Sequence, residues 1–174
     1  AEMRIAELET ALAEALLAAS TDELTGLFNR RGFQQAFERE RARNATPMAL
    51  AMIDLDDFKQ INDRLGHEVG DQALVHLAYL LRSHLRPADI VGRQGGEEFV
   101  ILFPETSLAD AGTALARLQQ ALRGSHLMGA AAALTFSGGL VALERSESLQ
   151  AVLQRADSAS YAAKRAGKNR IVVA

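Results

Sequence analysis

Gly95-Gly96-Glu97-Glu98-Phe99 stands between two runs that are rich in β-branched and apolar residues. Residues 90–93 precede it and residues 99–103 follow it, so the pentapeptide is predicted to form the tip of a β-hairpin. The glycines let the backbone turn tightly and let a polyanion approach, while the carboxylates are hard oxygen ligands for a divalent cation. The pattern therefore indicates a metal and phosphate site, although an ordinary hairpin turn with solvated acids explains it equally well.

Composition limits what kind of protein this chain can be. Its 174 residues, 48% hydrophobic and 24% charged, fit one globular domain with a short appendage. A net charge of −3 argues against a nucleic-acid polymer as partner. Cysteine is absent, which excludes disulfides and thiolate metal sites. We expect this chain to contain no membrane segment and no signal peptide, and to be located in the cytoplasm. A longer parent protein could still carry a membrane anchor outside this chain.

The first 20 residues are predicted to form a helix with an apolar seam. The seam residues recur at spacings of three and four, which is typical of a coiled coil: Ile5, Leu8, Leu12, Ala15 and Ala19. A helix that packs on its own domain would show a similar pattern. Because the chain starts in mid-helix, we expect a sensor domain upstream, a signalling helix over residues 1–20 and a second domain over residues 21–174.

A second acidic segment follows the first predicted core strand. Residues 48–55 are almost continuously apolar, which predicts a strand that is buried on both faces. Carboxylates at the end of such a strand are costly unless they meet a cation or hydrogen bonds. Asp54 is the first candidate metal ligand, and Leu55 offers its backbone carbonyl. The alternative is that Asp56 and Asp57 cap the next helix.

The remaining pattern predicts alternating helices and strands. We expect helices over residues 29–44, 71–85, 107–124 and 148–167, with Asp71 in the first turn of the second, and strands over residues 131–143 and 171–173. Gly138-Gly139 is predicted to be a bulge or a close approach. The order indicates an α+β fold, with a mostly antiparallel five-stranded sheet surrounded by helices and a ferredoxin-like, palm-like topology. In this fold Asp54, Glu97 and Glu98 would converge.

The chain resembles the GGDEF family of diguanylate cyclases, in the variant with Glu at the third position of the motif. The resemblance rests on Gly95 to Phe99 and on further motifs in family order, at residues 22–31, 54–63, 66–71, 93–99, 161–164 and 167–170. It implies a palm-like nucleotidyl cyclase fold. It also implies condensation of two GTP into cyclic di-GMP with release of two pyrophosphates.

The resemblance further implies roles for individual residues. Asp54, the carbonyl of Leu55, Glu97 and Glu98 would hold Mg²⁺, with Mn²⁺ as a possible substitute, and Glu98 could also help to activate the 3′-hydroxyl. The guanine base would be bound by Asn62 and Asp71, with His67 nearby. The triphosphate would be met by the residues Asp57, Phe58, Lys59, Lys164 and Lys168.

Regulation and assembly are implied as well. Arg86 and Asp89 match an inhibitory site for cyclic di-GMP, and Asp110 and Arg117 correspond to a secondary part of it. Each domain would hold one GTP, so activity requires a homodimer. Three alternatives are a silent domain that binds cyclic di-GMP as a receptor, a structural dimerisation domain, and a cyclase that acts on a single triphosphate.

Overall fold

One five-stranded sheet organises the domain. The computed structural model describes residues 1–125 and 133–174. The strands lie in the order β2 (Ile90–Gly95), β3 (Glu98–Phe103), β1 (Ala49–Leu55), β4 (Phe136–Ala142) and β5 (Ile171–Val173). The pairs β2–β3, β3–β1 and β1–β4 are antiparallel, and β5 runs parallel to β4. The predicted α+β class with a mostly antiparallel sheet is confirmed.

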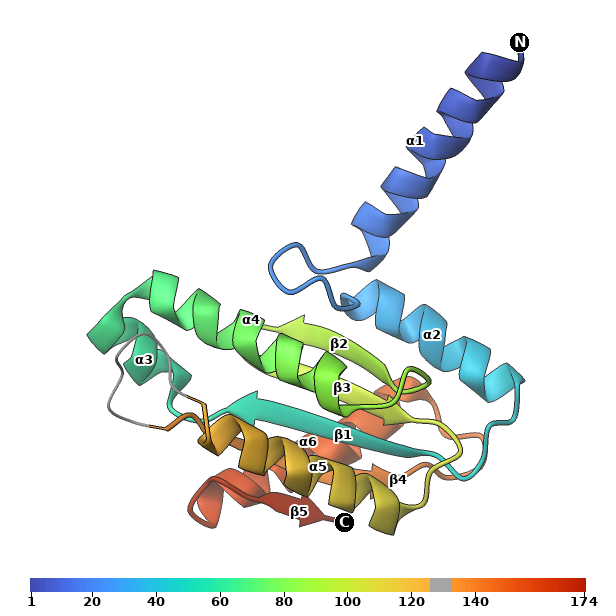
Figure 1. The fold of residues 1–174 in the computed structure, drawn as a ribbon. Helices are drawn as coiled ribbons and strands as arrows, with labels where there is room; N and C mark the ends of the chain where they lie inside the picture. The colour runs from blue at the N-terminus through green and yellow to red at the C-terminus, as the bar shows by residue number, and fades with distance from the viewer. Residues whose placement is uncertain (126–132) are drawn as a thin grey trace.

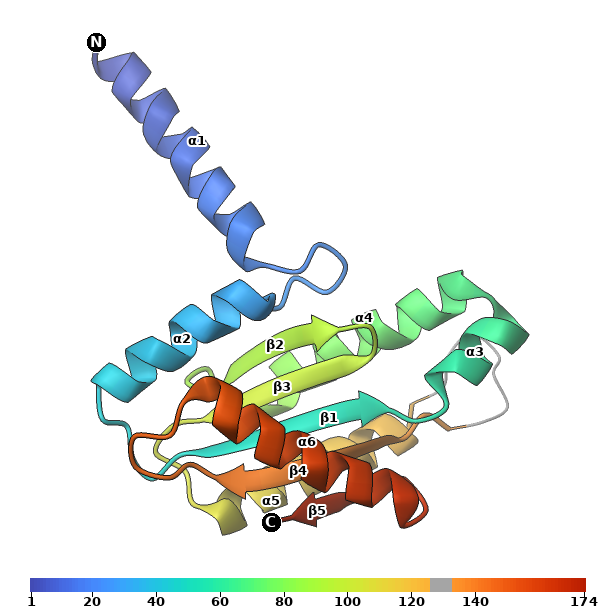
Figure 2. The same ribbon diagram turned by 180° about the vertical axis from the view of Figure 1, so that it is seen from behind.

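Helices cover both faces of this sheet (Figures 1 and 2). α4 (His67–His84) and α5 (Leu108–Arg123) lie on one face, and α2 (Arg30–Ala42) and α6 (Leu149–Arg165) lie on the other. All seven residues of β1 are buried, because their side chains alternate between the two cores. The continuous apolar run in the sequence is thus explained by a central strand that is covered on both sides.

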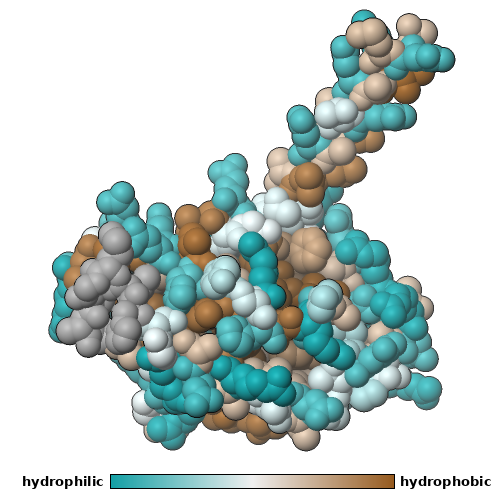
Figure 3. All heavy atoms as spheres, in the orientation of Figure 1, coloured by the Kyte–Doolittle hydropathy of each residue, from teal (hydrophilic) through white to brown (hydrophobic). Residues whose placement is uncertain are grey.

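α1 (Glu2–Ser20) projects away from the domain, as Figure 1 shows. None of its residues is buried, and Leu8 and Leu12 are 60% and 61% exposed. Brown patches mark apolar side chains along the helix in the space-filling view (Figure 3). The alternative that this helix packs on its own domain is therefore wrong, and its apolar residues are left open to a partner. No helix in residues 1–125 and 133–174 combines the length and the apolar character needed to cross a membrane.

Local signals located most element ends correctly. Asn29, Ser107 and Ser148 cap α2, α5 and α6, each accepting a hydrogen bond from a backbone amide three residues ahead. The predicted close approach at Gly138-Gly139 is also present. A Cβ atom on Gly139 would lie 2.2 Å from the carbonyl oxygen of Ala156, so α6 packs directly on the backbone of β4.

Two expectations about element boundaries were wrong. A separate helix, α3 (Phe58–Leu65), precedes α4, and α4 begins at His67, so Asp71 lies in its second turn and not in its first. Gly66 separates the two helices with a φ of 91°, a conformation that favours glycine. The strand expected from residue 131 begins at Phe136; residues 131 and 132 lie outside the described residues.

Candidate functional site

The end of β1 and the hairpin tip meet at one edge of the sheet. Asp54 pairs with Glu98 in the antiparallel register of β1 and β3. The amide of Leu55 donates to the carbonyl of Glu97 at 3.4 Å. Strand pairing thus brings the two acidic segments side by side, although they are about forty residues apart in the sequence, as the order of elements predicted.

Asp54 is the most strongly perturbed acid of this edge. Its side chain is only 8% exposed and accepts a hydrogen bond from the ammonium group of Lys164 at 2.5 Å. Burial raises the pKa of Asp54, Lys164 lowers it, and repulsion by Glu97 and Glu98 raises it again, to about 6. Concentrated negative charge of this kind at a buried strand end favours a bound cation.

Two lysines at the end of α6 and beyond it neutralise acids of the β1 end. Besides the pair between Lys164 and Asp54, Lys168 donates to Asp57 at 2.5 Å. Burial tends to lower the pKa of Lys164, but the hydrogen bond and charge of Asp54 outweigh it and raise the pKa. Of these two lysines, both predicted to contact a triphosphate, Lys164 therefore bonds a predicted metal ligand and Lys168 bonds Asp57, a predicted phosphate-binding residue.

Asp56 has a structural task that the sequence did not reveal. It is 8% exposed and accepts hydrogen bonds from Ser137 at 2.5 Å, Thr135 at 2.6 Å and the amide of Asn169 at 3.0 Å. These contacts join β1 to β4 and to the turn before β5. Asp57 occupies the N-cap position of α3, as the capping alternative predicts for one of the two acids, but its side chain makes no capping hydrogen bond. The acceptor role depends on partners about eighty and more than a hundred residues away, for which no local signal exists.

The predicted phosphate-binding segment forms the start of α3. Asp57 adopts a left-handed conformation with a φ of 57°, which turns the chain from β1 into the helix. Phe58 and Lys59 are the first residues of α3, and Lys59 is exposed. Free backbone amides at a helix start can meet phosphate oxygens, so this geometry is compatible with the predicted contact.

The predicted base-binding residues lie on α3 and α4. His67 and Asp71 are one turn apart on the same face of α4, and both are exposed. Asn62 lies on α3, and its side-chain oxygen is buried without a hydrogen-bond partner. It contacts Gly70, where an added Cβ atom would come within 1.8 Å of that oxygen. A buried acceptor without a partner is unusual, and a ligand with N–H donors would satisfy it.

The donor set fits a divalent metal in its chemistry. Carboxylates and a backbone carbonyl are the oxygen ligands that Mg²⁺ and Mn²⁺ prefer. Across residues 1–125 and 133–174, however, no three His, Asp or Glu side chains are gathered into a ready-made metal cluster. Asp54 instead bonds to Lys164, and Glu97 and Glu98 are partly exposed. The ligand set of Asp54, Leu55, Glu97 and Glu98 therefore stays a prediction.

A second candidate site lies at the far end of the hairpin. The four residues predicted to bind cyclic di-GMP, Arg86, Asp89, Asp110 and Arg117, line one cavity of about 280 Å³. Arg86 donates to Asp89 at 3.1 Å and to Thr106 at 2.5 Å. Thr106 is buried and was missed by the sequence reasoning, since a lone threonine before a helix cap carries no binding signal.

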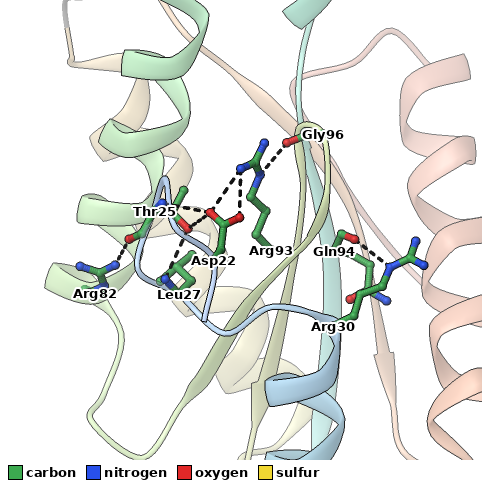
Figure 4. Close-up of polar contacts among 8 residues, drawn as sticks. All are labelled: Asp22, Thr25, Leu27, Arg30, Arg82, Arg93, Gln94 and Gly96. Atoms are coloured by element: carbon green, nitrogen blue, oxygen red, sulfur yellow. Dashed lines mark hydrogen bonds and ion pairs between the residues drawn. The ribbon is translucent and has the colours of Figure 1, made fainter. Parts of the chain in front are cut away.

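Arg93, near the hairpin tip, and its partner Asp22 were also missed as part of the site. Arg93 donates to the carbonyl of Gly96 at 2.9 Å and forms an ion pair with Asp22 at 3.2 Å (Figure 4). Arg93 lies two residues before Gly95, the first residue of the acidic motif, and Asp22 follows α1. A charged residue in the strand before a glycine turn was the available signal, but only the fold shows its partner.

The structure is an α+β domain. Its central strand and hairpin tip present carboxylates at one edge of the sheet, beside Lys164 of the last helix and Lys168 just beyond it. Residues 19–170 match the family described as "Diguanylate cyclase, GGDEF domain". The chain belongs to this GGDEF family, and cyclases of the family are generally metal-dependent.

Known proteins similar to this chain carry the same description. Diguanylate cyclase DgcP of Pseudomonas aeruginosa is 45% identical over an alignment of 161 residues, which covers 90% of this chain and 24% of that protein. The crystal structure of the coiled coil and GGDEF domain of DgcB from Caulobacter crescentus in complex with c-di-GMP is 31% identical, with a TM-score of 0.93 over 99% of this chain and 95% of that one. The active GGEEF domain of a diguanylate cyclase from Vibrio cholerae is 33% identical, with a TM-score of 0.75 over 83% and 96% of the two chains. The chain spans 24% to 39% of the length of the first curated relatives.

Proposed function

We propose that this chain is a diguanylate cyclase domain, which condenses two GTP molecules into cyclic di-GMP and releases two pyrophosphates. The single observation that carries the proposal is the juxtaposition of Asp54 and Glu98 across β1 and β3, with Glu97 at the turn. Family membership and the names of the relatives support the same reaction. The Vibrio cholerae domain is described as active with the GGEEF motif, so Glu97 in place of Asp is compatible with catalysis.

In the proposed reaction, the 3′-hydroxyl of one GTP attacks the α-phosphorus of the other. Asp54, Glu97, Glu98 and the carbonyl of Leu55 would hold Mg²⁺ or Mn²⁺. The bound cation would lower the pKa of the attacking hydroxyl and offset the charge that develops on the phosphates. Lys164 would exchange its contact with Asp54 for one with a phosphate oxygen, since the cation would then neutralise Asp54. Lys168 and the amides at the start of α3 would bind the triphosphate.

Substrate choice is assigned to residues of α3 and α4. Asp71 can accept hydrogen bonds from the adjacent N1–H and amino group of guanine, a donor pair that adenine lacks. Asn62, whose side-chain oxygen has no partner among the described residues and lies against Gly70, would supply a second acceptor once its side chain turns toward the base. His67 lies on the same face of α4 as Asp71 and completes the proposed base site.

Catalysis is proposed to require a homodimer, because each domain holds one GTP and the two must face each other. The exposed apolar residues of α1 offer a pairing surface outside the catalytic domain. A sensor domain in the parent protein would act by changing the pairing of these helices, and a cytoplasmic location would supply GTP.

Product inhibition is proposed at the cavity lined by Arg86, Asp89, Asp110 and Arg117. Arginine can bind phosphate or a guanine edge with two parallel hydrogen bonds. The same cavity supports a second candidate function, a silent domain that acts as a cyclic di-GMP receptor. In the receptor the acids at Asp54, Glu97 and Glu98 would have no task, so we favour the cyclase.

The test is product identification. The protein, at high concentration, is incubated with GTP and Mg²⁺, and the products are identified by mass spectrometry. We expect cyclic di-GMP from the wild type and a loss of about a hundredfold or more in rate for Glu97→Gln, which keeps the shape of the side chain but removes its charge. A cyclic mononucleotide would instead indicate a cyclase that acts on one triphosphate.

The control separates the enzyme from the receptor. Arg86→Ala should leave cyclic di-GMP synthesis intact at early times and abolish its slowing as product accumulates. If neither the wild type nor any variant forms product, while added cyclic di-GMP binds tightly and Arg86→Ala removes this binding, the chain is a receptor.

A further inference from the structure

The segment that follows α1 wraps around the free edge of the hairpin. Phe28 bridges Thr21 on one side and Gly92 of β2 on the other. Its amide donates to Val91 at 3.3 Å, and its carbonyl accepts from the amide of Arg93 at 2.8 Å. The chain between α1 and α2 is therefore joined by backbone hydrogen bonds to the strand that leads into the acidic turn.

On the α4 face, an ion pair ties this segment to the turn. Arg93 donates through Nε to the carbonyl of Gly96 at 2.9 Å and through one terminal nitrogen to both oxygens of Asp22 at 3.2 Å (Figure 4). Asp22 is itself fixed by the amide and hydroxyl of Thr25, at 2.9 and 2.7 Å. Thr25 is buried, and its carbonyl accepts from Arg82 of α4.

On the opposite face, Arg30 makes the matching contact. It is the first residue of α2, and its Nε donates to the carbonyl of Gln94 at 2.9 Å, as Figure 4 also shows. The preceding residue, Asn29, caps α2 and donates to the carbonyl of Ala19 at 3.0 Å, in the last turn of α1. Arg30 is thus fixed to the same junction between α1 and α2.

Strand pairing holds Glu97 and Glu98, through the amide of Leu55 and the register with Asp54, but the two glycines before them have no packed side chain around them. Gly95 and Gly96 have φ angles of 159° and 48°, and a Cβ atom on either would meet no atom within 4 Å. No atoms pack where a side chain at Gly95 or Gly96 would lie, and glycine gives the backbone there wide freedom. The carbonyls held by Arg30 and Arg93 belong to Gln94 and Gly96, so the two contacts flank Gly95 from opposite faces of the sheet.

We propose that Arg30 and the pair of Arg93 with Asp22 are positioning residues, which hold the Gly95-Gly96 turn and thereby place Glu97 for the metal. Both contacts start from residues 22–30, directly after α1, so this segment connects the orientation of α1 to the position of Glu97. The inference rests on the proposed cyclase function for its catalytic consequence. The turn's fixed position, by contrast, is a property of the folded chain alone.

The charges support the arrangement at neutral pH. Burial tends to raise the pKa of Asp22, but hydrogen bonds from Thr25 and Arg93 outweigh it and hold the pKa below the ordinary value. Asp22 is therefore ionised, and its bonds to Arg93 are charge-assisted on both sides. Such a pair holds the guanidinium plane so that Nε points at the carbonyl of Gly96.

The test compares three variants with a matched control. Arg30→Ala removes the contact on the α2 face, Asp22→Asn removes the charge that orients Arg93, and the double variant removes both. Arg39→Ala is the control, because Arg39 is an exposed arginine of the same helix, α2, in its last turn. Each protein is first shown to keep the thermal midpoint of the wild type within a few degrees.

The first measurement is hydrogen exchange of the turn amides, residues 94–98, in the metal-free full chain. Loss of one charge-assisted hydrogen bond should accelerate exchange there about tenfold, with β1 unchanged. The double variant should exceed either single variant, and Arg39→Ala should match the wild type. Unchanged exchange in Arg30→Ala and Asp22→Asn would overturn the proposal.

The second measurement compares kcat with KM for GTP in each variant. A merely destabilised fold would not lower kcat while leaving KM unchanged. Misplacing Glu97 should lower kcat about tenfold or more while KM for GTP stays within about twofold, since the base site on α3 and α4 is untouched. Arg30→Lys should recover part of kcat, because an ammonium group can still donate to the carbonyl of Gln94. Equal loss in Arg30→Lys and Arg30→Ala, or a rise in KM with kcat unchanged, would contradict the positioning role.

The two proposals fail in different ways. If the wild type forms no cyclic di-GMP but hydrogen exchange of the turn amides accelerates in the variants as expected, the proposed cyclase reaction is wrong. The proposal that Arg30 and Arg93 fix the position of the turn is then still supported. If the wild type forms cyclic di-GMP and the turn amides do not respond, the cyclase reaction stands and the positioning role is wrong.

Discussion

Asp54 is an acid whose charge is opposed by most of its surroundings. It is 6% exposed at the end of a central strand and lies beside Glu98 in the register, and among the residues that the structure describes Lys164 alone offsets its charge. The carboxylate is therefore the least stable charge of the metal-free site. A buried carboxylate in an unfavourable environment indicates a function that requires its negative charge. We propose that this function is to bind a cation.

This environment predicts that the free energy of unfolding depends on pH. The pKa of Asp54 is raised from 3.8 to about 6, so between these values the folded protein holds a proton that the unfolded chain has released. The stability contributed by protonated Asp54 is thus present at low pH and lost as the pH rises through this window. Relative to Asp54→Asn, the free energy of unfolding of the wild type should fall by about 1–2 kcal/mol across it.

The measurement is urea unfolding of both proteins in the presence of a chelator, below and above this pH window. A difference between wild type and variant that does not change with pH would show that Asp54 is not destabilised by its ionisation. Addition of Mn²⁺ above the window should restore stability to the wild type and not to Asp54→Asn.

At the scale of elements, direct packing of α6 on β4 sets the place of Lys164. Gly139 leaves room for the backbone of α6, where a Cβ atom would lie 2.2 Å from the carbonyl of Ala156 and 2.5 Å from the amide of Ser160. Lys164 follows one turn after Ser160 on the same helix. The distance between α6 and the sheet thus decides whether the lysine reaches Asp54.

Adding one methyl group should test this packing. Gly139→Ala is expected to lower the free energy of unfolding by about 2–4 kcal/mol, because backbone atoms of α6 cannot move aside as a side chain would. The control is Gly112→Ala in α5, whose Cβ atom would lie 3.8 Å from Leu140. That change should stabilise by about 0.5–1 kcal/mol through helix propensity. Similar midpoints for both variants in chemical denaturation would contradict the close approach.

At the scale of the whole molecule, α1 extends beyond a domain that has its own two cores. It carries the exposed apolar residues Met3, Ile5, Leu8, Leu12, Leu16 and Leu17. An isolated helix of this length is marginal in water, so burial against a partner helix would stabilise it. Pairing of two copies through the Ile5, Leu8 and Leu12 seam is the arrangement that the proposed dimer needs.

Replacing Leu8 and Leu12 by Gln should weaken this pairing. Four leucines per dimer lose burial, so the dimer dissociation constant should rise about tenfold or more. Turnover per protomer should then fall more steeply on dilution than in the wild type, as measured together with sedimentation velocity. The control is Thr10→Gln with Glu14→Gln, off the seam on the same helix. Identical dilution curves for both variants would mean that α1 takes no part in assembly.

Much of this protein followed from local patterns. The apolar run of β1, the glycine turn between two β-branched strands and the capping residues Asn29, Ser107 and Ser148 were sufficient to predict the sheet and most helices. These signals work because strand burial, turn geometry and helix capping depend on residues within a few positions of one another. The acidic groups of the candidate site were also visible, since carboxylates are out of place at the end of a buried strand.

Other features were decided only when distant segments met. The separate helix α3, the partners of Asp56, the pairing of Lys164 with Asp54 and the hold of Arg30 and Arg93 on the turn depend on contacts across tens of residues or more. No local pattern encodes such contacts, because a hydrogen bond or ion pair depends on distance in space and not on spacing in the chain. The sequence by itself therefore determined which chemistry this protein carries, while the tertiary structure decided which groups restrain it and where each charge is balanced.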